Sequence, residues 1–184
     1  MVDPTGEEAW LVARAINFAD SDHMFVVVAD ELGGEVQHQF LFGPEHGFNP
    51  FTGDQGAFGS LVALQGTETP TNADDMAAWQ SLANGGADGV SITPINADDQ
   101  PVIDAGQAVT QALGTPDNPG NIAYYPVTNP GTVSNGCNSN CGAYGTATRA
   151  LQNDGSAATQ SLPPGARTPG WGQTDHVLDE VDRQ

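Results

Sequence analysis

One apolar run constrains the fold of this chain more than any other feature. From His23 the sequence reads HMFVVVA, a β-branched and nearly continuous apolar stretch that is typical of a central, buried strand. A Gly33-Gly34 turn follows, and residues 36–42 then alternate between apolar and polar positions, with His38 on the apolar side. The sequence therefore predicts a β-hairpin.

Other segments of the chain predict a mixture of strands and helices. Further extended segments are expected at residues 10–16, 61–64, 90–95 and 122–127. Three helices are expected. The first follows Asn72 and ends near Gly85, and the second follows Asn96 and ends near Gly114. The third begins near Cys141 and ends near Asp154-Gly155.

The predicted order of elements favours an α+β fold, in which helices pack against an antiparallel sheet. A chain of 184 residues is long enough for one domain with its own core. We expect that domain to span residues 1–172, followed by an acidic, flexible tail at residues 173–184.

The charge of the chain excludes several classes of partner. It has 23 acidic residues against four arginines and no lysine, which gives a formal net charge of −19. Such a chain cannot neutralise the phosphates of nucleic acids and is repelled by anionic membrane surfaces. Its acidity is typical of adaptation to concentrated salt, where screening acts over about 3 Å at 1 M.

The apolar segments also bear on localisation. No apolar run approaches the roughly 18 residues that a membrane-spanning helix needs. Residues 1–20 lack the pattern of a classical signal peptide. We therefore expect a soluble protein, either cytoplasmic or exported by a non-classical route.

One stretch, SNGCNSNCGAY, holds the only two cysteines, Cys137 and Cys141. A disulfide between them would close a small loop and constrain the unfolded chain little. A zinc site needs about four ligands, and Cys-x3-Cys combined with His23, His38 or His46 matches no familiar spacing. The cysteines can also be small buried residues without a chemical role.

The interpretation that we favour is a thiol nucleophile, without a metal or another cofactor. Cys141 lies where a helix is expected to begin, and the positive end of a helix lowers the pKa of a thiol. A nucleophilic thiol also needs an imidazole to accept its proton, and a third polar group to orient that ring.

Two features far apart in the sequence match a known pattern. Asn140–Tyr144 reads NCGAY at the start of an expected helix, and His23 heads an expected core strand. In these features, and in the order of elements over residues 10–172, the chain resembles the circularly permuted papain-like superfamily. That superfamily includes lecithin–retinol-acyltransferase-like proteins and permuted NlpC-like thiol hydrolases.

The resemblance implies a role for each site residue. Cys141 would be the nucleophile, His23 the base and then the acid, and His38, on the return strand, the residue that orients His23. Asn140, together with backbone N–H groups at the helix start, is a candidate for stabilising the oxyanion. Cys137 is the alternative nucleophile, because it begins a Cys-Asn-Ser variant of the family motif.

The function implied is that of a cysteine-dependent hydrolase or an acyltransferase. It would act on a peptide, amide or ester carbonyl through an acyl-enzyme thioester. The alternative is a non-enzymatic binding module, of a toxin-associated or phage-associated kind, which has the same fold and structural cysteines.

Overall fold

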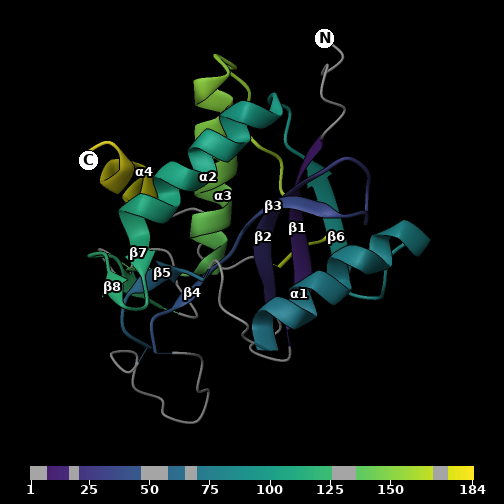
Figure 1. Cartoon of the computed structure of the whole chain (residues 1–184), viewed down its shortest axis with the longest axis horizontal. Coiled ribbons are helices and arrows are strands. Elements are labelled where there is room, and N and C mark those ends of the chain that lie inside the picture. Colours follow the sequence, from purple (N-terminus) through teal and green to yellow (C-terminus); the bar gives the residue numbers. More distant parts are fainter. Residues whose placement is uncertain (1–7, 17–20, 47–57, 65–69, 126–135, 168–173) are drawn as a thin grey trace.

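The computed structural model describes residues 8–16, 21–46, 58–64, 70–125, 136–167 and 174–184. Its architecture is α+β, with an antiparallel sheet and packed helices, as the sequence predicts (Figure 1). The strands are β1 (Glu8–Ile16), β2 (Ser21–Ala29), β3 (Val36–Phe40), β4 (Phe42–Pro44), β5 (Leu61–Ala63), β6 (Val90–Pro94), β7 (Gly114–Thr115), β8 (Asn118–Pro119), β9 (Ala123–Tyr124) and β10 (Gly136–Cys137). The helices are α1 (Pro70–Ser81), η2 (Leu82–Asn84), α2 (Asp99–Leu113), α3 (Ser139–Asn153) and α4 (Asp175–Val181).

The main sheet has four strands in the order β3-β2-β1-β6, and all of its neighbours are antiparallel. Strand β2 is central, and each of its nine residues is buried. Its pairing with β1 sets Arg14 directly opposite His23 at one end of the sheet. The apolar run that begins at His23 therefore forms the central strand predicted for it.

Helices cover both faces of this sheet (Figure 1). Met24 and Val26 belong to the large core cluster that also contains buried residues of α2 and α3. Phe25 and Val27 point the other way and share a second cluster with Trp79 of α1. Alternate residues of one strand thus serve two cores, which explains why the run has no polar position.

The edge of the hairpin differs from the sequence-based expectation. The pairing of β2 with β3 shifts register between Val28 and Ala29, and Val28 lies opposite His38. His38 is exposed, whereas the alternation placed it on the apolar side. After Phe40 the chain leaves the main sheet, and β4 pairs with β5 instead. The irregular pairing and the early departure of the strand break the simple period of two.

The acidic C-terminal segment also differs from its expectation. Residues 173–184 were predicted to be a flexible tail, but Asp175–Val181 forms α4. Val177 of this helix is fully buried, and α4 packs on α2 and α3. Packing of Val177 in the core therefore accompanies the helical structure of this charged segment.

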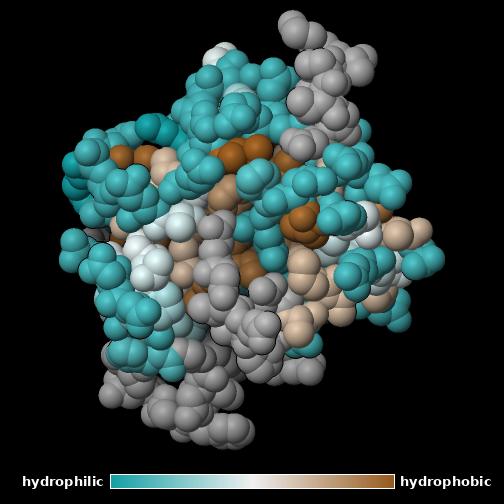
Figure 2. Space-filling model, viewed as in Figure 1, coloured by the Kyte–Doolittle hydropathy of each residue, from teal (hydrophilic) through white to brown (hydrophobic). Residues whose placement is uncertain are grey.

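The surface is consistent with the acidic composition. The face in Figure 2 is mostly hydrophilic, and hydrophobic residues show only as small patches. Among the described residues, Leu32 is the one large hydrophobic residue that is exposed, at 39%. No helix in the described part of the chain is both long enough and apolar enough to cross a membrane.

The packing of α2 on β3 gives a test of this core. A methyl group added at Gly106 of α2 would lie 2.3 Å from ring atoms of Phe40. Gly106→Ala gains about 1 kcal/mol of helix propensity, but overpacking costs about 1–3 kcal/mol. We expect a net loss of unfolding free energy in urea denaturation. In a Phe40→Leu background the same substitution should be neutral or stabilising, and an equal loss in both backgrounds would contradict the packing described.

Candidate functional site

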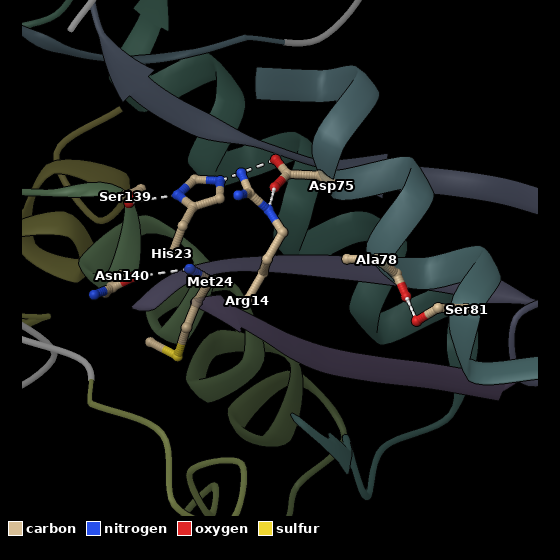
Figure 3. A network of polar contacts seen from close by, with 8 residues as sticks. All are labelled: Arg14, His23, Met24, Asp75, Ala78, Ser81, Ser139 and Asn140. Carbon is tan, nitrogen blue, oxygen red and sulfur yellow. Dashed lines mark hydrogen bonds and ion pairs between the residues drawn. The ribbon is translucent and has the colours of Figure 1, made fainter. Parts of the chain in front are cut away.

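His23 joins two helices at the end of the main sheet (Figure 3). Its Nδ1 atom lies 2.8 Å from Oγ of Ser139, the first residue of α3. Its Nε2 atom lies 3.1 Å from Oδ2 of Asp75, which belongs to α1. The three side chains come from distant parts of the sequence, and the fold brings them into one chain of hydrogen bonds.

Asp75 is fully buried and is shared by two partners. Its second oxygen, Oδ1, accepts a hydrogen bond of 2.8 Å from Nε of Arg14. Arg14 and His23 are opposite each other on β1 and β2, so both side chains reach the same carboxylate. A buried carboxylate stays ionised only when it is paired, and a guanidinium is always charged. We therefore treat Asp75 as an ionised hydrogen-bond acceptor.

The partners of His23 determine which of its ring nitrogens carries the proton. An ionised carboxylate can only accept hydrogen bonds, so Nε2 of His23 must be the donor to Asp75. In the neutral ring Nδ1 is then an acceptor, and the hydroxyl of Ser139 donates to it. This is the arrangement in which an imidazole can remove a proton from a hydroxyl.

The start of α3 supplies a positive electrostatic environment at Ser139. Asn138 is the N-cap, and its side chain accepts a hydrogen bond of 3.0 Å from the backbone N–H of Asn140. The carbonyl of Asn138 accepts the N–H groups of Cys141 and Gly142. Among the described residues of this turn, the backbone N–H of Ser139 is the one that has no hydrogen-bond acceptor. A negative charge that develops at Ser139 is therefore favoured by the helix end.

Tyr124 of β9 is a further buried titratable residue. Burial raises the pKa of its phenol far above its ordinary value, and the Ser139 side chain offsets only part of that effect. The phenol is therefore neutral, and able to donate a proton, across the physiological range.

Asn140 has a different role from the one predicted for it. Its Oδ1 atom accepts a hydrogen bond of 2.8 Å from the backbone N–H of Met24, and its Nδ2 atom donates one of 3.0 Å to the carbonyl of Asp22. The amide is thus used to join α3 to β2, rather than being directed at an oxyanion. Because Asp22 and Met24 flank His23, this clamp sets the position of the imidazole.

The two cysteines form a disulfide, which was the less favoured interpretation of the sequence. Cys137 lies in β10, outside the helix that holds Cys141, and their Cα atoms are 5.8 Å apart. This distance suits a bridge, whereas two cysteines on one helix would be poorly directed. Both residues are fully buried. Neither sulfur is a thiol in this structure, so Cys141 and the alternative nucleophile Cys137 have no thiolate to offer.

His38 does not lie beside His23. It is exposed on β3 opposite Val28, which is five residues along β2 from His23. The position predicted for His38, next to the second ring nitrogen of His23, is occupied by Asp75. The prediction that His38 orients the base is therefore wrong. The described residues contain no group of three or more His, Cys, Asp or Glu side chains that could hold a metal ion.

Three members of the network, Arg14, Asp75 and Ser139, are not among the site residues that the sequence predicts. The sequence contains one indication that Asp75 is buried. Asp75 precedes Trp79 by four residues, so the two side chains lie on the same face of the helix, and Trp79 is buried. An acidic residue on an apolar face needs a buried partner. Ser139 gave no such signal, because a serine at a helix start is commonly a capping residue.

No family model matches this chain, and no curated protein or solved structure matches it either. The resemblance to the permuted papain-like superfamily therefore stays a prediction.

The role of Asn140 can be tested through stability. Asn140→Ala removes two buried hydrogen bonds and leaves the N–H of Met24 and the carbonyl of Asp22 without this partner. Each unsatisfied group costs about 1–3 kcal/mol, so we expect the two together to lower the unfolding free energy by about 2–6 kcal/mol. The matched control is Asn153→Ala at the exposed end of the same helix, which should change stability by less than about 0.5 kcal/mol. Equal effects of the two substitutions would contradict the clamp.

Proposed function

We propose that this protein is a hydrolase or acyltransferase that forms a covalent intermediate on Ser139. The proposal depends on one observation: His23 contacts the Ser139 hydroxyl with one ring nitrogen and the Asp75 carboxylate with the other (Figure 3). A nucleophile, a base and a group that orients the base are the three components that covalent acyl transfer requires.

The reaction follows from the direction of these hydrogen bonds. Oγ of Ser139 attacks the carbonyl carbon of an amide or ester while its proton passes to Nδ1 of His23. The imidazolium then gives this proton to the leaving amine or alcohol, the bond between the carbonyl carbon and the leaving group breaks, and an acyl ester remains on Ser139. Water, or another acceptor activated by His23, releases the acyl group and restores the serine. Asp75 stabilises the imidazolium and stays ionised throughout.

The proposed chemistry keeps the substrate class expected from the sequence but changes the nucleophile. A cysteine-dependent reaction would need the Cys137–Cys141 bond to be reduced, and His23 would have to leave Ser139 for a sulfur. Ser139 needs neither step. A histidine that heads a strand and faces the start of a later helix is also the arrangement that the resemblance to the permuted papain-like superfamily implies. We therefore propose that the substrate is a peptide, an amide or an ester.

A second candidate is a binding module in which the same network is structural. Burial favours it, because Ser139 and His23 are each only 6% exposed and Asp75 is fully buried. In that case the chain of hydrogen bonds that runs from Arg14 through Asp75 and His23 to Ser139 serves only to hold α1 and α3 on the two faces of the sheet. The two candidates differ in one respect, which is whether Ser139 reacts with an electrophile.

Labelling with a small alkyl fluorophosphonate tests the proposal. We expect one adduct on Ser139, located by peptide mass spectrometry, and no adduct in Ser139→Ala. His23→Ala should slow the reaction by about 10²-fold or more, because the base is lost. Ser156→Ala, at a half-buried serine outside the network, and the double variant Cys137→Ala/Cys141→Ala should both still be labelled at Ser139.

Two results would contradict this assignment. If the folded wild-type chain stays unlabelled under conditions that label a serine esterase, the binding module is the better interpretation. If the reduced chain is instead alkylated rapidly at Cys141 near pH 6, and this reactivity is lost in His23→Ala, the nucleophile is the cysteine.

A further inference from the structure

Arg14 is the most buried arginine of a chain that has four arginines and no lysine. Its side chain is 16% exposed, whereas those of the other three are 27% to 65% exposed. Its Nε atom donates to Oδ1 of Asp75 over 2.8 Å, and Oδ2 of the same carboxylate contacts His23 (Figure 3). Arg14 is therefore a fourth member of the network, beside the nucleophile, the base and the group that orients the base.

The charge balance of the network depends on Arg14. Asp75 is fully buried, and in the described part of the chain it contacts two titratable groups, Arg14 of β1 and His23 of β2. The neighbouring acidic residue, Asp22, precedes His23 on β2, but its carboxylate accepts the backbone N–H of Arg167. Burial disfavours a charged carboxylate that has lost its cation, so such a group gains a proton. Without Arg14 we expect that proton to bind within the pair formed by Asp75 and His23.

The added proton has two places in this pair, and both disable the base. Nε2 of His23 and Oδ2 of Asp75 share one hydrogen bond. If the ring binds the added proton, both of its nitrogens are donors. If Oδ2 binds it, the carboxyl group donates to Nε2, and the neutral ring carries its proton on Nδ1. In both cases Nδ1 can no longer accept the proton of Ser139.

We propose that Arg14 is a positioning residue, whose charge holds the proton of His23 on Nε2 and so keeps Nδ1 able to accept the proton of Ser139. The relevance of this role to catalysis rests on the function proposed above. Arg14 acts through Asp75 and touches no reacting atom. The pairing of β1 with β2 sets Arg14 opposite His23, which is why one carboxylate reaches both.

The alternative is a salt bridge that only holds α1 on β1. Such a structural role needs a donor to Oδ1 of Asp75, and a neutral side chain can supply one. The proposed role needs the positive charge itself, because an uncharged donor leaves the buried carboxylate without a cation. The two roles therefore differ in a variant that keeps the hydrogen bond but loses the charge.

Three substitutions of Arg14 in the full chain test the inference. Arg14→Gln keeps a donor for Oδ1 without the charge, Arg14→Met removes both, and Arg14→Lys keeps a charge. The matched control is Arg149→Met, at an arginine of α3 that pairs with Asp182 over 2.8 Å outside the network. The measurements are the long-range ¹H–¹⁵N correlation spectrum of His23 near neutral pH, and the acylation rate with p-nitrophenyl acetate as a function of pH.

We expect Arg14→Gln and Arg14→Met to carry a proton on Nδ1 of His23 near neutral pH. Their acylation rate per folded molecule should fall by about 10²-fold, because the base is lost, while KM stays close to the wild-type value. The rate should recover as the pH is raised, at a higher pH than in the wild-type chain, because loss of a nearby positive charge makes the pair hold its proton more tightly. Arg14→Lys should keep the ring proton on Nε2 alone and most of the rate, and Arg149→Met should behave like the wild-type chain.

The outcomes separate this inference from the proposed function. If wild-type Ser139 is not acylated but Arg14→Gln still places a proton on Nδ1, the proposed function is wrong and the control of His23 by Arg14 is upheld. If Arg14→Gln keeps its ring proton on Nε2 alone near neutral pH, Arg14 is not a positioning residue. A loss of rate that is the same at every pH also overturns the inference, because it shows a structural role. Arg14→Gln decides the question if Arg14→Met does not fold, since its amide still satisfies Oδ1 of Asp75.

Discussion

The site depends on the buried carboxylate of Asp75. This group cannot be buried alone, and it is paired with Arg14 of β1 on one oxygen and with His23 of β2 on the other. Removal of one partner from a buried pair typically costs about 3–5 kcal/mol. The same contacts hold α1 on its face of the sheet and fix the tautomer of His23. Stability and the proposed chemistry therefore require the same hydrogen bonds.

Two clamps place the start of α3 against this network from the other face of the sheet. The disulfide joins Cys141 in the first turn of the helix to Cys137 of β10, and the side chain of Asn140 binds the backbone on both sides of His23. Ser139 lies between these fixed points, so its hydroxyl has little freedom relative to the imidazole. Preorganisation of this kind is what covalent acyl transfer needs, because a misplaced nucleophile loses much of its rate.

Much of the fold could be predicted from the sequence, because its strands and helices have clear local patterns. The apolar run at β2 and the glycines that end η2 and α2 are examples. His23 could be identified as the centre of the site, but its partners could not. Asp75 and Ser139 are common residue types in unremarkable local contexts, and only the tertiary packing of α1 and α3 brings them near His23. The sequence does not favour the disulfide, because a bridge over so short a loop constrains the unfolded chain little. The structure places Cys137 on a strand outside the helix of Cys141, where the bridge forms.

The protonation state of His23 tests the central claim most directly. Long-range ¹H–¹⁵N correlation spectra of the imidazoles, recorded above the titration of His23, report which ring nitrogen carries the proton. The hydrogen-bond chain predicts a proton on Nε2, shifted downfield by Asp75 and moved by Asp75→Asn, and an unprotonated Nδ1 whose shift changes in Ser139→Ala. A proton on Nδ1, or a His23 signal that neither substitution alters, would contradict the account.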